Sequence, residues 1–179
     1  EEDNNGEPSL VGRFAFSPMY GSDFGLSFHT GAYNIFKSEG LTIDDRRRLS
    51  ILAFDAEHTL AGLNIQGEAA FASIEIPRSL QGLFAERQAG YYLQLNMPFA
   101  FGWIPMWERS KLTASARYEW LDLDRHIQGD DRRRLTVGLN FRPVQDTALK
   151  LNYEQNWVRD REDNLTRGVR IIFSLASYF

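Results

Sequence analysis

Charged side chains recur at every second position in parts of this chain, and they are its best candidates for acting on a solute. Asp55 and Glu57 are two residues apart, and so are Arg117 and Glu119. In a β-strand, such pairs point to the same face. A face that carries both signs of charge sets up an electric field that orders water and favours small charged solutes over apolar ones.

Histidine offers the other possible chemistry. His29 lies two residues from Ser27, and Asp55 is expected inward on the next strand, so a nucleophile, a base and an orienting carboxylate could meet. No catalytic motif accompanies this set, and the acidic groups lack the spacing of a dedicated metal site. We therefore expect no enzyme activity, no cofactor and no metal.

The elements that would position these residues are β-strands. Residues 168–179 show the pattern well, because an almost wholly apolar series alternates with a mixed one. The same period of two recurs along the chain and predicts about nine strands. The expected short turns are 18–23, 61–62 and 143–146, with an aromatic segment at 101–109; the longer loops are 37–47, 77–86, 126–132 and 159–165.

Composition restricts the setting of these strands. The chain has 179 residues, a net charge of −4, no cysteine and a mean hydropathy of −0.39. It contains no apolar run of about 18 residues, which excludes a transmembrane helix but not a transmembrane barrel, whose strands alternate. The mild negative charge argues against nucleic acid as a partner.

The aromatic residues sort by height along the expected strands. Two aromatic belts at opposite ends of alternating strands are typical of a membrane barrel. The belt at the short turns comprises Phe16, Phe99, Phe141 and Phe179, and the belt at the longer loops comprises Tyr91, Trp120 and Trp157.

The fold predicted is an all-β, antiparallel transmembrane β-barrel, with residues 1–179 forming one domain or barrel segment. Single-chain bacterial barrels have an even number of strands. Nine strands therefore indicate the C-terminal portion of a larger barrel, with residues 1–8 as the remnant of an external loop.

The charged residues of the expected inner face would line the hollow of this barrel. Early strands contribute mainly acidic groups and later strands mainly basic ones, so an acidic wall would face a basic wall. The alternative is a ladder of salt bridges that only stiffens the wall. The candidates are Arg13, Asp55, Glu57, Glu68, Lys111, Arg117, Glu119, Arg134, Arg142, Lys150, Glu154 and Arg170.

A six-residue sequence, DDRRRL, occurs at 44–49 and again at 130–135. Its arginines could gather anions at a pore mouth or bind lipopolysaccharide phosphates, which suit the guanidinium group. The alternative is a solvated acid–base loop. The candidates are Arg46, Arg47, Arg48, Arg132 and Arg133.

Four segments resemble the C-terminal half of large Gram-negative porins, particularly the phosphate-selective porin O/P type. They are PSLVGRFAFSP (8–18), GLSFHTGAYN (25–34), LQLNMPF (93–99) and SLASYF (174–179). The resemblance implies an outer-membrane barrel of about 16 to 18 strands, commonly trimeric, that allows passive diffusion. It places no phosphate-selecting residue in this chain.

Three functions remain open at this point. The first is a porin for small hydrophilic solutes, anions included, in the outer membrane of a Gram-negative bacterium. Its partners would be outer-membrane lipid and lipopolysaccharide, with a homotrimer or the remainder of the same barrel. The second is a structural barrel with a plugged lumen that acts as a tether or assembly partner. The third is a soluble barrel, which would place Leu135, Val137, Leu149 and Leu151 in a closed core.

Overall fold

The computed structural model describes residues 8–33, 37–42 and 46–177, and it is almost entirely β-structure. Within these ranges no helix is long and apolar enough to cross a membrane. A single turn of 3-10 helix, η1 (Arg78–Leu80), and a two-stranded hairpin, β3 (Lys37–Ser38) and β4 (Leu41–Thr42), lie in connections. The strands of the main sheet are β1 (Leu10–Met19), β2 (Ser22–Ala32), β5 (Arg48–Leu60), β6 (Leu63–Ile74), β7 (Arg87–Phe101), β8 (Lys111–Asp122), β9 (Asp131–Arg142), β10 (Thr147–Arg159) and β11 (Leu165–Ser177).

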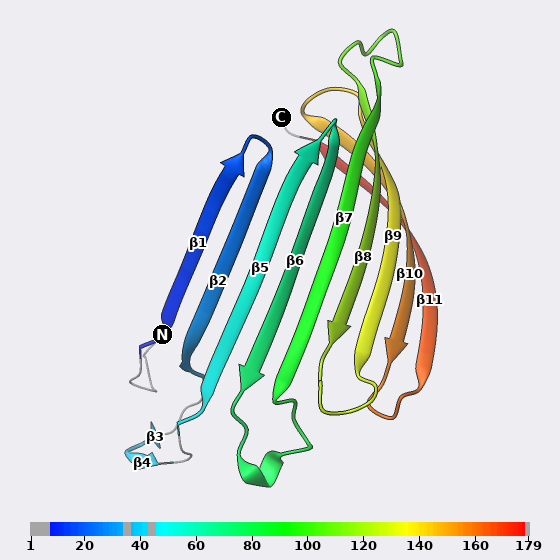
Figure 1. Ribbon diagram of the computed structural model, residues 1–179. Coiled ribbons are helices and arrows are strands. Elements are labelled where there is room, and N and C mark those ends of the chain that lie inside the picture. The colour runs from blue at the N-terminus through cyan, green and yellow to red at the C-terminus, as the bar shows by residue number, and fades with distance from the viewer. Residues whose placement is uncertain (1–7, 34–36, 43–45, 178–179) are drawn as a thin grey trace.

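These nine strands form one antiparallel meander in the order β1-β2-β5-β6-β7-β8-β9-β10-β11. The predicted number of strands is therefore confirmed. The sheet does not close on itself, because among the described residues β1 pairs only with β2 and β11 only with β10. Strands β7–β11 curve away from the plane of β1–β6, which gives the sheet the form of an open trough (Figure 1).

The pairing register assigns every strand residue to one of two faces, because side chains alternate. One face, here called the apolar face, carries Phe54 on β5, Leu95 on β7, Val137 on β9 and Ile171 on β11. The other, here called the polar face, carries most of the charged and amide side chains. A period of two produces this separation in every strand.

The described residues contain almost no hydrophobic core. Ala89 is the one hydrophobic residue among them that is buried. Large apolar side chains on the apolar face are exposed, including Phe173 at 68%, Leu151 at 49% and Leu139 at 45%. Leu135 and Val137 are exposed as well. The dry interior that a soluble barrel would need from these leucines and valines is therefore not formed by this sheet.

The connections differ in length at the two ends of the sheet (Figure 1). Short turns join β1 to β2, β5 to β6 and β9 to β10, and longer connections lie at the opposite end, as predicted. In the two-residue turn Ala61–Gly62 both residues have positive φ (50° and 86°), the geometry of a type I′ hairpin. The 102–110 segment is long for the short-turn end, as the sequence indicated.

Some predicted boundaries were wrong. The expected turn at 18–23 shrinks to residues 20–21, because Met19 pairs with Ser22. The expected loop at 126–132 ends before Asp131, which pairs with Asp122 and starts β9. In both places the backbone stays paired at residues that are charged or that favour turns. A search for alternating hydrophobic residues does not detect such pairing.

The longer connections contact one another. Arg161, in the β10–β11 connection, donates hydrogen bonds to the carbonyl oxygens of Gly82 (3.1 Å) and Leu83 (3.4 Å) in the β6–β7 connection. The same guanidinium lies 3.4 Å from Oδ2 of Asp124, whose side chain is 3% exposed. One arginine thus ties together three connections at this end of the sheet.

Candidate functional site

All twelve charged candidates of the inner face lie on the polar face of the sheet. The register pairs Asp55 with Glu68, Glu119 with Arg134 and Glu154 with Arg170, each across adjacent strands. The remaining six follow from the same alternation: Arg13, Glu57, Lys111, Arg117, Arg142 and Lys150. The alternation in the sequence thus places all twelve residues on one face of the sheet.

The polar face of strands β1–β6, here called its acidic half, carries Asp55, Glu57 and Glu68, and Arg13 is the one basic residue among the twelve candidates there. Strands β8–β11 form the basic half. Arg13 of β1 donates to both carboxylate oxygens of Asp55 on β5, at 2.6 and 2.8 Å, and also to Ser27 at 3.0 Å. This pair spans β2, which lies between them, and it passes over Gly25. A Cβ on residue 25 would lie 2.5 Å from Nη2 of Arg13, so a glycine is what lets the two groups meet.

Three amide side chains form a hydrogen-bonded chain across the middle of the polar face. Arg117 of β8 donates to Oε1 of Gln94 (3.3 Å), and Gln94 donates to Oδ1 of Asn96 (3.0 Å). Asn96 then donates to Oδ1 of Asn64 (3.1 Å), and Asn64 donates to Oε1 of Glu57 (2.7 Å). The chain begins at a cation on β8 and ends at an anion on β5.

The basic half contains both paired and unpaired cations. Glu119 receives Arg117 at 3.0 Å and lies 3.7 Å from Arg134. Glu154, with a side chain 10% exposed, lies 3.1 Å from Arg170. Ion pairs of the kind that the ladder interpretation requires therefore form between Glu119 and Arg134 and between Glu154 and Arg170.

Three further cations of the basic half lack such partners. No carboxylate of the described residues lies within ion-pair distance of Lys111, Arg142 or Lys150. Lys111 and Arg142 are directly opposite each other in the register, and Lys150 is opposite Asn140. Their positive charge is therefore not compensated by an ion pair, and it makes the electrostatic potential positive at the short-turn end of the polar face.

The polar face is hollowed where these groups meet. A recess of about 440 Å³ lies over β7–β10, and amides, hydroxyls and charges line it. Such a surface can exchange hydrogen bonds with a hydrated solute at many positions. Its lining residues are Gln94, Asn96, Thr113, Ser115, Arg117, Glu119, Arg134, Thr136, Asn140, Lys150, Asn152 and Glu154.

The two DDRRRL sequences do not occupy equivalent positions. Leu49 lies on the polar face and Leu135 on the apolar face, so the second copy is out of step with the first by one residue. Arg48 and Arg133 consequently lie on the apolar face, whereas Arg132 lies on the polar face. Arg46 and Arg47 precede β5 and line a recess with Glu75. The structure therefore does not bring the five predicted arginines together at one mouth.

The aromatic residues at the longer-loop end lie side by side on the apolar face. Tyr91 and Trp120 have ring centroids 5.4 Å apart, and Trp157 lies in register with Arg133, the neighbour of Trp120. At the short-turn end the belt residues lie on three strands, Phe16 on β1, Phe99 on β7 and Phe141 on β9. Phe179 lies outside the described residues, as do residues 1–7 of the expected external loop remnant.

The structure adds aromatic partners that the alternation did not reveal. Phe16 stacks on Phe24 at 5.3 Å, and Trp107, in the 102–110 connection, packs against Phe141 at 5.9 Å. Phe24 sits at the start of a strand that was expected, so its position could have been inferred. Trp107 reaches Phe141 only because its connection folds back, which no spacing in the sequence indicates.

Sequence reasoning also missed the amide chain. The signal was present in the alternation of Gln94 and Asn96 on one strand, but amides carry no charge and did not stand out. The histidine set is not assembled as considered, because Asp55 is bound by Arg13. A different histidine, His58, contacts Ser22 through Nδ1 at 2.6 Å on the apolar face.

Comparison with known proteins gives no guide to this site. No protein-family model matches the chain, and no curated protein is significantly similar to it.

Proposed function

We propose that this chain forms part of a transmembrane β-barrel porin, in the outer membrane of a Gram-negative bacterium, through which small hydrophilic solutes diffuse. The observation that carries the proposal is the sidedness of a sheet whose described residues have almost no core. Exposing a continuous apolar face to water is unfavourable. Lipid on the apolar face and water on the polar face satisfy both sides.

The height of the apolar face suits a bilayer. On β9 the residues of this face are Leu135, Val137 and Leu139, with Arg133 at one end and Phe141 at the other. These eight steps span about 27 Å along the strand, or about 20 Å along the normal at a typical tilt, close to the roughly 25 Å apolar band of outer-membrane barrels. A polar or aromatic residue thus bounds the apolar segment at each interface.

The open edges support a larger barrel than nine strands. Because the strands alternate in direction, β1 and β11 run the same way, and direct pairing between them would be parallel. An all-antiparallel barrel therefore requires an odd number of additional strands between these two edges. We propose that such strands, from the same polypeptide or a partner, complete a barrel of about 16 to 18 strands, and that barrels associate as a homotrimer.

Selectivity in this proposal arises from the polar face. Its acidic half and its basic half are joined by the amide chain, so the field runs across the wall. Lys111, Arg142 and Lys150 retain unpaired charge and would raise the local concentration of anions. Small anionic and zwitterionic solutes are accordingly the class expected to pass most readily.

The test is conductance of the full protein in planar lipid bilayers. Discrete current steps at low voltage, together with a requirement for detergent or lipid to remain folded, are expected. A folded membrane-inserted protein that gives no conductance would favour the structural barrel with a plugged lumen. A protein that folds and stays monomeric in buffer without detergent would overturn both.

A further inference from the structure

Aromatic and basic side chains form a row across the apolar face at the longer-loop end. The register places Tyr91, Trp120, Arg133, Trp157 and Arg167 next to one another on strands β7, β8, β9, β10 and β11. Each member is directly opposite the next. The row therefore crosses the strands at right angles, at the border between the apolar residues and the connections.

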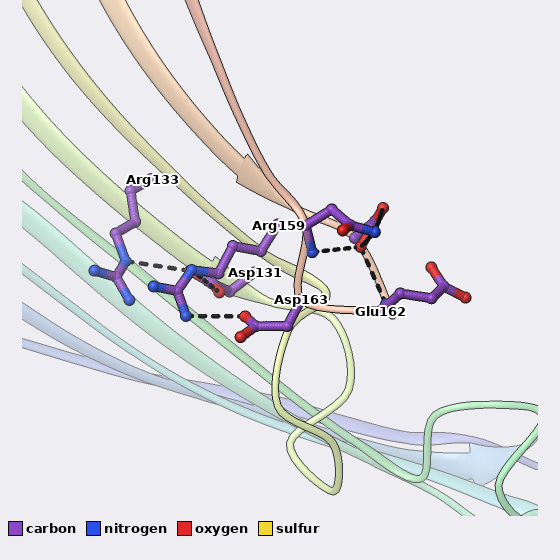
Figure 2. Close-up of polar contacts among 7 residues, drawn as sticks. Asp131, Arg133, Arg159, Glu162 and Asp163 are labelled. Carbon is purple, nitrogen blue, oxygen red and sulfur yellow. Dashed lines mark hydrogen bonds and ion pairs between the residues drawn. The ribbon is translucent and has the colours of Figure 1, made fainter.

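A second layer of charge lies between this row and the connections. Asp131 accepts a hydrogen bond from Nε of Arg133 at 3.1 Å and lies 3.8 Å from Nε of Arg159. Arg159 also donates to Asp163 at 3.0 Å. Figure 2 shows Asp131 joined by dashed lines to the guanidinium groups of both Arg133 and Arg159. The two carboxylates thus hold two arginines in place on this face.

The positive charge of this cluster is not fully matched by those carboxylates. Arg133 and Arg159 have side chains 45% and 39% exposed, so most of their donors remain available. Arg167 is exposed and has no carboxylate partner among the described residues. Asp122, opposite Asp131, accepts a hydrogen bond from the backbone N–H of Asp124 (3.1 Å).

We propose that Arg133, Arg159 and Arg167 bind the phosphate of a lipopolysaccharide lipid A headgroup, with Trp120 and Trp157 packing beside it. This inference rests on the proposed function, because it needs the apolar face to meet lipid. Arginine at this border is costly in hydrocarbon but favourable beside an anionic headgroup. The planar guanidinium binds phosphate oxygens through two parallel hydrogen bonds, and tryptophan prefers the same interfacial depth.

The binding test uses the full protein refolded in detergent micelles. It is titrated with bisphosphorylated lipid A and, separately, with the dephosphorylated form, and binding is followed by native mass spectrometry. The unmodified protein is expected to prefer the phosphorylated form at least tenfold. The double variant R133Q/R167Q, which leaves Arg159 to neutralise Asp131, should weaken binding of that form about twenty-five-fold, or about fivefold per arginine.

The matched control is R132Q, which removes the same charge from the adjacent residue on the polar face and should leave lipid A binding unchanged. Equal binding by the double variant, or an equal loss in R132Q, would overturn the proposal. Displacement of lipid A by an equal concentration of inorganic phosphate would do so too, since the site would then recognise a free anion. If the double variant fails to fold, R133K/R167K keeps the charge but loses the bidentate donors; it should bind the phosphorylated form more weakly than the unmodified protein, and unchanged binding would overturn the proposal.

Conductance measurements distinguish a failure of the lipid A site from a failure of the proposed porin function. In bilayers free of lipopolysaccharide, R133Q/R167Q should form channels like those of the unmodified protein. A protein that binds lipid A with the stated preference but does not conduct would refute the porin and leave the lipid site intact.

Discussion

Arg117 and Glu57 are the two ends of a single hydrogen-bonded chain that crosses the polar face from β8 to β5. Arginine can only donate and a carboxylate can only accept. Every amide between them, Gln94, Asn96 and Asn64, must therefore accept on the arginine side and donate on the glutamate side. The charges at the two ends fix the orientation of all three amides, which gives this part of the polar face a permanent dipole.

The first prediction concerns the middle of that chain. Asn96→Asp removes the N–H group that donates to Oδ1 of Asn64. If the Asn64 amide turns over to donate to the new carboxylate instead, it no longer donates to Glu57, so one hydrogen bond of the chain is lost in either orientation. We expect a loss of about 1 kcal/mol in the free energy of unfolding, the typical worth of one net hydrogen bond. The measurement is urea denaturation of the protein in lipid vesicles. Gln88→Glu, on the same strand and face but outside the chain, is the control and should change stability less.

The second prediction concerns the crossing of Arg13 and Asp55 over β2. Gly25→Ala places a methyl group between their side chains, so the bidentate pair must open. We expect a lower urea midpoint for Gly25→Ala. The control is Gly168→Ala on β11, where an added Cβ meets nothing within 4 Å and should leave the midpoint unchanged or raise it. Equal effects in the two variants would show that the loss reflects strand propensity alone.

The third prediction concerns the unpaired cations. Removing Lys111, Arg142 and Lys150 together as glutamines leaves the paired residues of the wall in place but cancels the positive potential at the short-turn end. Reversal potentials in a salt gradient should shift toward cation preference, and single-channel conductance should fall at low ionic strength more than at 1 M, where the Debye length is only about 3 Å. An unchanged reversal potential would place these residues outside the permeation path.

The fold was largely predictable because a period of two carries two kinds of information. It marks where strands occur, and it assigns each residue to a face, so all twelve charged candidates could be placed on one and the same face. The exposed apolar face was predictable for the same reason. Closure was not, because the alternation within nine strands does not say what lies along the outer edges of β1 and β11.

The details of the site were less predictable, for physical reasons that differ by residue. Arg48 and Arg134 occupy the same place in the DDRRRL sequence but lie on opposite faces, because β9 begins three residues earlier relative to the sequence than β5 does. The pairing of Arg13 with Asp55 depends on Gly25, which has no side chain to attract notice. The amide chain depends on which residues lie opposite each other on neighbouring strands. That register can be assigned only when the exact turn residues are known.

The fourth prediction concerns acid and the β10–β11 connection. Asp160 accepts hydrogen bonds from the side chain of Asn164 (3.0 Å), from its backbone N–H (2.8 Å) and from the N–H of Glu162 (3.0 Å). The Asn164 side chain and these backbone groups lower the pKa of Asp160 below its usual range. A lowered pKa stabilises the folded connection above the unfolded value of about 3.9, and that stabilisation is lost as the pH falls through the lower, folded value.

The measurement for this connection is amide hydrogen exchange at residues 162 and 164. Protection should be constant from neutral pH down to about 4 and should decrease below it, after correction for the intrinsic pH dependence of exchange. Asp160→Asn should show weaker protection at neutral pH and no further decrease on acidification. Protection in the unmodified protein that persists well below pH 3 would mean that Asp160 does not organise this connection.

The last prediction tests which face meets lipid. Val137 lies midway between Arg133 and Phe141 on the apolar face, and the adjacent Thr136 lies on the polar face. An arginine at the bilayer midplane of a barrel costs about 2–4 kcal/mol, whereas a lumen position allows its hydration. Val137→Arg should therefore destabilise the protein by that amount in lipid vesicles, and Thr136→Arg by about 1 kcal/mol or less. The same pair in a water-soluble protein with an unburied face would differ little, because both arginines would be solvated. Comparable free energies of unfolding for the two variants would remove the membrane from the explanation of this sheet, and with it the reason for reading its polar face as a pore wall.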